Sequence, residues 1–390
     1  MLLLKMLKML GLPKKAEVRG GARRCLRAAA MTMLAATGAG CAGFPADRTG
    51  SCARLLTVAD RAGGLREAEI SVLTYNVEGL PWPIRKGRSS RLREIARQLS
   101  AMRAAGTAPD IVLLQEAFSG SAVAIGRRAG YANFVRGPAA GARRPPTSQE
   151  AERALVGNRK RRKGEGLRRL MPSGLYILSD FPVAAAERQP FRARECAGFD
   201  CLSNKGLLHA RIAVPGVPDP LEVFNTHLNS RGSTGVSEER SLLAHRLQVD
   251  ETNRFIEARR EPANPLIFGG DFNMRHAPGR FEHFALRQQW PLVHQHCLSE
   301  GAACDVRLSW DGDAPWMDTQ DLQGFASGAR VQVRPVRVDA MFDEPWKGRP
   351  LADHDGLLVV YRLSWHGEPG EPDTAQSRCS SRPANALAGR

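Results

Sequence analysis

Side chains of the types that bind metals and move protons follow several short apolar runs in this sequence. The stretch "LIFGGDFNMR" places Asp271 and Asn273 two positions apart, directly after the apolar run 266–268. Side chains at i and i+2 of an extended chain point to the same face, so we expect this carboxylate and this amide to project side by side. A turn also uses Gly, Asp and Asn, so the stretch alone leaves both interpretations open.

Other residues of these types close or follow further apolar runs. They are Asn76, Glu116, His227, Asp339, Asp353 and His354. Functional groups gather beyond the strand ends of open α/β sheets, so we expect these side chains to meet. Oxygen donors without thiolates suit a hard cation, Mg²⁺ or Mn²⁺, and histidines transfer protons near neutral pH. The set therefore predicts metal-assisted hydrolysis of a phosphate ester.

The elements that must position these residues alternate between strands and helices. Helical spacing of apolar residues predicts helices over 91–106 and 237–259 and a short one over 121–131. The predicted strands lie within 70–76, 110–115, 173–183, 204–214, 221–229, 264–273, 336–342 and 351–363. This order favours an α/β protein in which two packed, mixed sheets carry helices outside, a four-layer α/β/β/α sandwich.

The positive charge of the chain is concentrated in two segments. The chain has 390 residues, 43% of them hydrophobic, and a formal net charge of +16. Residues 1–44 hold eight Lys/Arg and one Glu, and residues 141–169 hold ten Lys/Arg and three Glu. The rest is close to neutral, so charge alone does not make this a nucleic-acid-binding protein. We interpret 141–169 as a mobile surface insert that contacts an anionic lipid surface, contacts nucleic acid, or has no partner.

The first of these segments has the order of an export signal. A basic run is followed by an apolar stretch of small residues, as in secretory signals. Arg23-Arg24 weakly resembles a twin-arginine signal, and Cys41 weakly resembles a lipoprotein acylation site. We therefore expect export from a bacterial cell, with the protein periplasmic, secreted or lipid-anchored. A lead-in over 45–69, a catalytic domain over 70–363 and a disordered tail over 364–390 complete the predicted organisation.

The cysteines agree with an exported protein. Six remain after the signal region, and two pairs are close in sequence, Cys196/Cys201 and Cys297/Cys304. Six cysteines permit 15 connectivities, so the sequence does not fix the pairing. Closure of short loops favours those two pairs, with Cys52 joined to Cys379. Disulfides indicate an oxidising compartment.

Six short motifs carry a family resemblance. The motifs "TYNVEG", "LLQEAF", "NTHLN", "GGDFN", "VDAMF" and "ADHDG" occur in the order found in the endonuclease/exonuclease/phosphatase superfamily. The resemblance covers about residues 70 to 362. Each motif alone is weak, but the ordered set is specific.

The resemblance implies a role for each matching residue. For the metal, it implies Glu116 as the principal ligand, supported by Asn76, Asp353 and Asp271, of which Asp271 also positions the attacking water. For the substrate, it implies phosphate contacts from His227, Asn273 and Asn229. For proton transfer, it implies His354 as the general acid or base, oriented by Asp339.

One segment distinguishes between the classes of substrate that this superfamily hydrolyses. The stretch "CAGFDCLSNKGLLHARI" resembles the sphingomyelinase-like members of the superfamily. It implies an exported, Mg²⁺-dependent phosphodiesterase or phosphatase that acts on a phospholipid headgroup. The alternative is a secreted endonuclease, which the basic insert supports. A non-catalytic binding module is disfavoured because both His227 and His354 are present.

Overall fold

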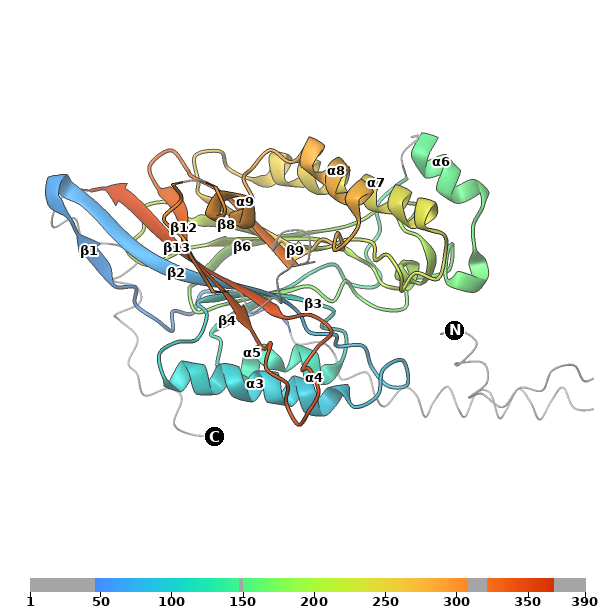
Figure 1. The fold of residues 1–390 in the computed structure, drawn as a ribbon, viewed down its shortest axis with the longest axis horizontal. Helices are drawn as coiled ribbons and strands as arrows, with labels where there is room; N and C mark the ends of the chain where they lie inside the picture. Colours follow the sequence, from blue (N-terminus) through green and yellow to red (C-terminus); the bar gives the residue numbers. More distant parts are fainter. Residues whose placement is uncertain (1–45, 147–149, 300, 308–320, 368–390) are drawn as a thin grey trace, which may run out of the picture.

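Two β-sheets pack face to face with helices on both outer sides, as predicted from the sequence (Figure 1). The structure, a computed structural model, describes residues 46–146, 150–299, 301–307 and 321–367. Within these residues, both sheets contain parallel and antiparallel pairs. The α/β class with two mixed sheets is therefore confirmed.

The first sheet joins strands from both ends of the described chain. Its strand order is β10-β12-β13-β2-β3-β5-β4, with β1 paired to β2. The strands are β1 (Val58–Asp60), β2 (Leu65–Asn76), β3 (Ile111–Gln115), β4 (Asn133–Arg136), β5 (Tyr176–Ser179), β10 (Asp305–Arg307), β12 (Gln332–Met341) and β13 (Gly356–His366). β2 and β13 extend beyond the predicted domain limits of 70 and 363, so part of the predicted lead-in belongs to the sheet.

The second sheet carries the stretch "LIFGGDFNMR". Its order is β11-β9-β8-β7-β6. The strands are β6 (Val183–Pro190), β7 (Gly206–Ile212), β8 (Leu221–His227), β9 (Leu266–Asp271) and β11 (Asp321–Ala326). β8 and β9 are parallel, whereas β11 is antiparallel to β9. β11 was not predicted from the sequence.

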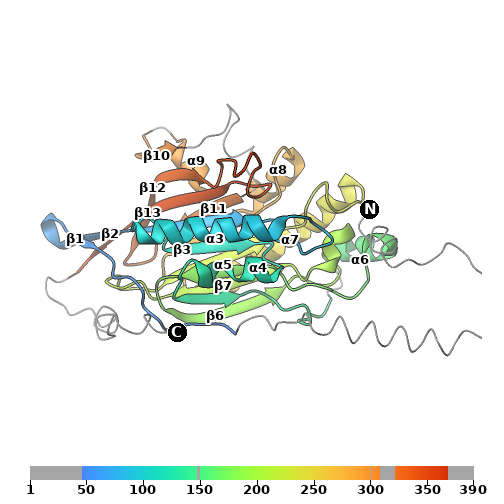
Figure 2. The same cartoon turned by 90° about the horizontal axis from the view of Figure 1, so that it is seen from below.

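Helices cover the outer face of each sheet (Figures 1 and 2). On the side of the first sheet lie α3 (Arg88–Ala104), α4 (Gly120–Val123) and α5 (Ile125–Arg128). On the other side lie α6 (Glu150–Gly157), α7 (Glu238–Arg259) and α8 (Pro278–Arg287), and α9 (Val293–Cys297) follows. Val72 packs between the sheets while Leu73 packs beneath α3, so both faces of β2 are covered and its last five residues are all buried.

The basic insert is folded onto the body of the protein, contrary to the prediction of a mobile segment. It contains α6 and a short 3₁₀ helix, η3 (Arg161–Lys163). Leu155 of α6 is buried in a cluster with Leu247 of α7. Glu165 forms an ion pair with Arg240 of α7 at 2.7 Å. Apolar burial and charge pairing, which the composition did not reveal, hold the insert in place.

Two of the three predicted disulfides are confirmed. Cys196 is bonded to Cys201, and Cys297 to Cys304. The predicted partner of Cys52, Cys379, lies outside the described residues, as do the predicted signal over 1–44 and most of the predicted tail. None of the described helices combines the length and the apolar composition needed to cross a membrane.

A histidine on α7 predicts loss of stability in acid. His245 is fully buried, and its Nε2 lies 2.8 Å from the carbonyl oxygen of Phe272. Burial, assisted by the charge of Arg280, lowers the pKa of His245 to about 3. The unfolded chain therefore binds a proton that the native state does not bind, and stability falls as pH falls from about 6.5 toward 3. At pH 4.5 this amounts to about 3 kcal/mol, at about 1.4 kcal/mol for each unit.

Denaturant unfolding at pH 7 and pH 4.5 measures this effect. His245→Gln keeps an N–H donor for Phe272 but does not titrate, so this variant should lose less stability between the two pH values than the unmodified protein. An equal loss in both proteins would show that other groups cause the acid sensitivity.

Candidate active site

The ends of three strands meet at one buried carboxylate. Asn76 ends β2, His227 ends β8 and Asp271 ends β9. Asp271 Oδ2 accepts a hydrogen bond from Asn76 Nδ2 at 2.9 Å and lies 3.2 Å from His227 Nε2. The Asn76 contact connects the two sheets, because β2 and β9 belong to different ones. The predicted meeting of strand-end residues is therefore observed for this group.

The stretch "GGDFN" is both a turn and part of the site. Asn273 adopts a left-handed backbone conformation with φ of 52°, and its N–H donates to Asp271 Oδ1 at 2.9 Å. The two side chains therefore do not follow the predicted extended spacing. Gly270 precedes them with φ of 155°, and a Cβ at this position would lie 2.2 Å from the carbonyl oxygen of Thr226. A glycine here lets β9 approach β8 closely enough to place Asp271 beside His227.

His354 lies between two buried aspartates. Its Nδ1 is 2.8 Å from Asp321 Oδ2, and its Nε2 is 3.8 Å from Asp271 Oδ2. Asp321 is the first residue of β11 and pairs directly with Asp271 across the β9–β11 ladder. The structure thus identifies Asp321, which the sequence analysis missed, as the residue that orients His354.

The predicted partner of His354, Asp339, has a different role. Asp339 lies on β12 in the first sheet, where its carboxylate accepts a hydrogen bond from Arg337 Nε at 2.8 Å. Residues two apart on a strand share a face, which explains this local pairing. The prediction that Asp339 orients His354 is wrong, because Asp321 occupies the position next to Nδ1.

The charges in this cluster set its protonation states. Burial disfavours the charged form of His354, but Asp321 and Asp271 outweigh it and raise the pKa of His354 well above its usual range. Burial would also raise the pKa of Asp271, yet His227 and His354 hold it well below its usual value. At neutral pH the cluster therefore contains an ionised Asp271 and a protonated His354, which are a proton acceptor and a proton donor.

The third carboxylate of the site is Glu116, which directly follows β3. Its backbone is left-handed, with φ of 54°, and Oε1 accepts a hydrogen bond from Asn76 Nδ2 at 3.3 Å. Over the described ranges, no Lys, Arg or His lies within ion-pair distance of this half-buried carboxylate. A carboxylate without a counter-charge, close to Asp271, is a donor set that fits a hard divalent cation.

The other predicted metal residues are arranged differently. Asn76 Oδ1 accepts a hydrogen bond from the N–H of Glu78, and Nδ2 points to the carboxylates, so Asn76 orients Glu116 and Asp271 in this arrangement. Asp353 is exposed and lies 3.8 Å from Arg85. Asp271, Asp321 and His354 also form a compact group of potential ligands, but His354 is protonated between the two acids there. The residues that fit a metal best are Glu116 and Asp271.

A buried lysine beside His227 was not predicted. Lys205 Nζ lies 2.8 Å from Asp200 Oδ2, 2.8 Å from the carbonyl oxygen of Leu228 and 3.0 Å from His227 Nε2. His227 Nε2 either accepts from Lys205 or donates to Asp271, because it cannot do both at once. The contact with Lys205 therefore influences whether Nε2 of His227 is a hydrogen-bond donor or an acceptor. In the sequence, Lys205 lies in the stretch "CAGFDCLSNKGLLHARI", which predicted only a family resemblance.

Asn229 and Asn273, which were both predicted to contact the substrate, are buried. The side chain of Asn229 is not available for a substrate contact. Asn229 is fully buried; its Oδ1 accepts from the N–H of Ala197 at 3.0 Å and its Nδ2 donates to the carbonyl oxygen of Ser230. The structure thus contradicts a substrate contact from Asn229, whose side chain anchors the loop that carries the Cys196–Cys201 disulfide. Asn273 donates one bond, to the carbonyl oxygen of Leu228 at 3.2 Å.

Comparison with known proteins identifies a family and curated relatives that resemble this chain. The model of the Endonuclease/Exonuclease/phosphatase family matches residues 73–342. A sphingomyelinase of Mycobacterium bovis is 25% identical over 312 residues, which cover 75% of this chain and 52% of the relative. The chain thus spans about half the length of the curated relatives that it matches.

Solved structures share the fold. A beta toxin variant from Staphylococcus aureus with bound magnesium ions aligns with a TM-score of 0.52 and 15% identity, covering 77% of this chain and 100% of the toxin. Sphingomyelinase C from Streptomyces griseocarneus aligns with a TM-score of 0.50 and 18% identity, covering 75% of this chain and 99% of that enzyme.

Proposed function

The chain belongs to the Endonuclease/Exonuclease/phosphatase family and is a phosphoric ester hydrolase, and we propose that it is an exported, Mg²⁺-dependent phosphodiesterase that cleaves the headgroup of sphingomyelin or a similar phospholipid. The observation that carries the proposal is the position of the Asp271 carboxylate. Asn76 of the first sheet and His227 of the second sheet contact it, and Asn76 also contacts Glu116, a carboxylate that has no ion-pair partner among the described residues. Glu116 and Asp271 would hold the cation, whose charge would polarise the phosphate ester.

Asp271 and the residues around it have different roles in the proposed hydrolysis. Asp271 orients a water molecule and accepts its proton as the water oxygen attacks phosphorus. His354, oriented by Asp321, donates a proton to the leaving oxygen as its bond to phosphorus breaks. His227 and Asn273 donate hydrogen bonds to the phosphoryl oxygen on which charge builds up.

Two observations support the substrate class and the compartment. The identity to mycobacterial sphingomyelinases extends over three quarters of this chain, and this favours a phospholipid over a nucleic acid. The Cys196–Cys201 and Cys297–Cys304 disulfides support export, because disulfides persist in oxidising compartments.

A panel of substrates tests the proposal. Purified protein with Mg²⁺ is assayed on vesicles that contain sphingomyelin, on phosphatidylinositol phosphates, on plasmid DNA and on bis-p-nitrophenyl phosphate. Asp271→Asn, purified in the same way, controls for contaminating enzymes. We expect release of phosphocholine from sphingomyelin and slower hydrolysis of the soluble diester. Hydrolysis of plasmid DNA without any lipid hydrolysis would overturn the substrate class and favour the endonuclease alternative.

A further inference from the structure

A small cavity lined by arginine side chains lies beside the candidate active site. Its volume is about 170 Å³, and the basic insert contributes much of its wall. The arginines that line it are Arg143, Arg144, Arg159, Arg168 and Arg169. None of the described residues that line the cavity is an aspartate or a glutamate. The cavity is therefore a strongly positive site, with a volume sufficient for a phosphate-containing group.

Most of these charges lack a counter-charge from the protein. Arg144 forms an ion pair with Glu251. Arg143, by contrast, donates to two backbone carbonyl groups of its own loop. Within residues 46–146, 150–299, 301–307 and 321–367, no carboxylate lies within ion-pair distance of Arg143, Arg159 or Arg168. These three exposed guanidinium groups are thus available to an anionic ligand.

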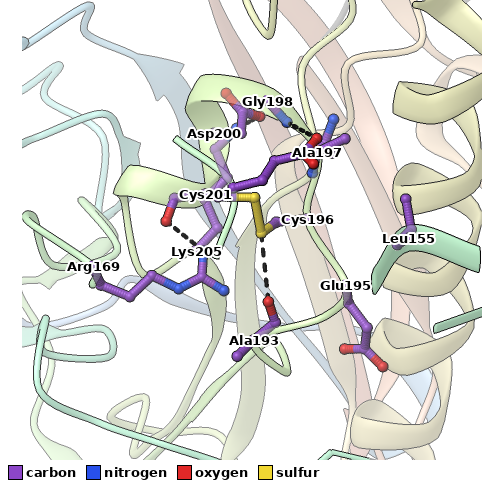
Figure 3. The surroundings of a disulfide bond; sticks show 12 residues. Leu155, Arg169, Ala193, Glu195, Cys196, Ala197, Gly198, Asp200, Cys201 and Lys205 are labelled. Atoms are coloured by element: carbon purple, nitrogen blue, oxygen red, sulfur yellow. Dashed lines mark hydrogen bonds and ion pairs between the residues drawn. A yellow bond between two sulfur atoms is a disulfide. The ribbon is translucent and has the colours of Figure 1, made fainter. Parts of the chain in front are cut away.

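Arg169 places a further positive charge at the base of the cavity. It is buried and donates to the carbonyl oxygens of Cys201 at 2.9 Å and Ser203 at 3.0 Å, beside the Cys196–Cys201 disulfide (Figure 3). Burial, together with the charge of Arg143, lowers the pKa of Arg169 to about 10. All of its hydrogen-bond acceptors in the structure are carbonyl oxygens, and the carboxylates of Asp200 and Glu195 only partly offset the cost of burying its charge. An anion in the cavity would reduce this cost further.

The cavity and the catalytic histidine lie on opposite sides of one chain segment. Asn204 lines the cavity and donates to the carbonyl oxygen of Ala139 at 2.7 Å. The next residue, Lys205, points the other way and lies 3.0 Å from His227. Near the cavity, Leu167 and Leu170 are 43% and 61% exposed. Exposed leucines among arginines are typical of surfaces that bind the interface of anionic membranes.

We propose that the arginine cavity, defined by Arg143, Arg159, Arg168 and Arg169, binds the phosphate group of an anionic phospholipid and attaches the enzyme to the membrane surface. This lipid is distinct from the one that is hydrolysed. Guanidinium groups suit phosphate because they donate two parallel hydrogen bonds to it. The inference rests on the proposed function in that the substrate is a membrane lipid, but it is tested by binding and not by hydrolysis.

The test is sedimentation of the full chain with vesicles of phosphatidylcholine, with and without phosphatidylglycerol. The pocket variant carries Arg143→Gln, Arg159→Gln and Arg168→Gln. The control variant carries Arg93→Gln, Arg127→Gln and Arg128→Gln, which remove the same charge from α3 and α5 on the opposite side of the sandwich (Figures 1 and 2). Each arginine near an anionic surface contributes about fivefold, so the pocket variant should bind phosphatidylglycerol vesicles on the order of 100-fold more weakly.

The control variant should lose less than about threefold, because its arginines lie beyond the screening length from the bound surface. Soluble glycerol phosphate should compete with the vesicles for the unmodified protein, since it carries the headgroup chemistry without the bilayer. An equal loss in both variants, or no competition, would overturn the proposal in favour of general surface charge. Unchanged vesicle binding with lost binding of single-stranded DNA would overturn it in favour of a nucleic-acid site. Because vesicle binding needs no catalysis, either result is independent of the substrate panel.

Discussion

Asp321→Asn should lower kcat by about 100- to 10,000-fold, the usual contribution of general acid–base catalysis, while KM changes little. The carboxylate of Asp321 lies 2.8 Å from His354 Nδ1 and keeps the ring oriented and protonated. Asparagine preserves the shape but removes the charge that stabilises the imidazolium. Steady-state hydrolysis of bis-p-nitrophenyl phosphate at saturating Mg²⁺ measures the effect without the complication of a lipid surface.

Asp339→Asn is the matched control, because Asp339 is paired with Arg337 and does not contact His354 in the structure. We expect this control to keep kcat within a few-fold of the unmodified enzyme. His354→Ala should lose as much as Asp321→Asn, and the double variant should be little worse than either, because the two residues act as a unit. A large loss in Asp339→Asn together with a small one in Asp321→Asn would contradict the assignment.

The pH profile gives a readout that a merely structural role would not change. The carboxylate of Asp321 raises the pKa of His354, so its removal should lower that pKa. If protonated His354 is the general acid, activity requires the imidazolium and declines at high pH. In Asp321→Asn the alkaline limb of kcat should therefore move to lower pH, whereas in Asp339→Asn it should stay in place.

Removal of the divalent cation should abolish activity, and Glu116→Gln should raise the Mg²⁺ concentration for half-maximal activity by on the order of 100-fold. Loss of one charged oxygen ligand changes the affinity of such sites by orders of magnitude. Glu116 is the site's carboxylate without an ion-pair partner among the described residues, so its charge is the one available to a cation. Activity after dialysis against a chelator, titrated with Mg²⁺ and then Mn²⁺, measures this.

Asp353→Asn distinguishes Asp353 from Glu116, two of the three carboxylates that the sequence assigned to the metal. Asp353 is exposed and faces Arg85, so we expect its variant to shift the Mg²⁺ requirement by less than about tenfold, in keeping with a supporting position. Full activity in the presence of excess chelator would contradict metal dependence. A greater effect from Asp353→Asn than from Glu116→Gln would place the metal at the rim and not beside Asp271.

Residues that follow parallel strands were predictable from the sequence. Asn76, His227 and Asp271 each end a strand, and a short apolar run followed by a polar residue marks such an end. Asp321 escaped this rule because β11 is antiparallel to β9. The first residue of β11 therefore lies at the edge where β9 ends, whereas a polar residue that closes an apolar run marks only the end of a strand. Asp339 was implied by the resemblance of "VDAMF" to the family, but it lies within β12 of the first sheet, where Arg337 pairs with it.

Tertiary contacts decided the remaining differences. Asn229 was assigned to the substrate from a motif, but its hydrogen bonds to Ala197 and Ser230 come from a loop that the motif does not describe. Nothing in the sequence around Lys205 indicates a contact with His227, because the two residues are 22 positions apart and only the fold brings them together. The basic insert is polar in composition, yet Leu155 and the Glu165–Arg240 pair dock it on α7. Composition measures the mean character of a segment, whereas docking depends on a few residues.

The most direct test of the account is hydrolysis of sphingomyelin in water labelled with oxygen-18. If Asp271 directs water to phosphorus, one labelled oxygen should appear in phosphocholine and none in ceramide, as mass spectrometry of the two products measures. The reaction should require Mg²⁺, and Asp271→Asn should show no labelled product above background. Label in ceramide would mean that the bond between carbon and oxygen is broken instead, and unlabelled phosphocholine would mean that water is not the nucleophile; either result would contradict the proposed chemistry.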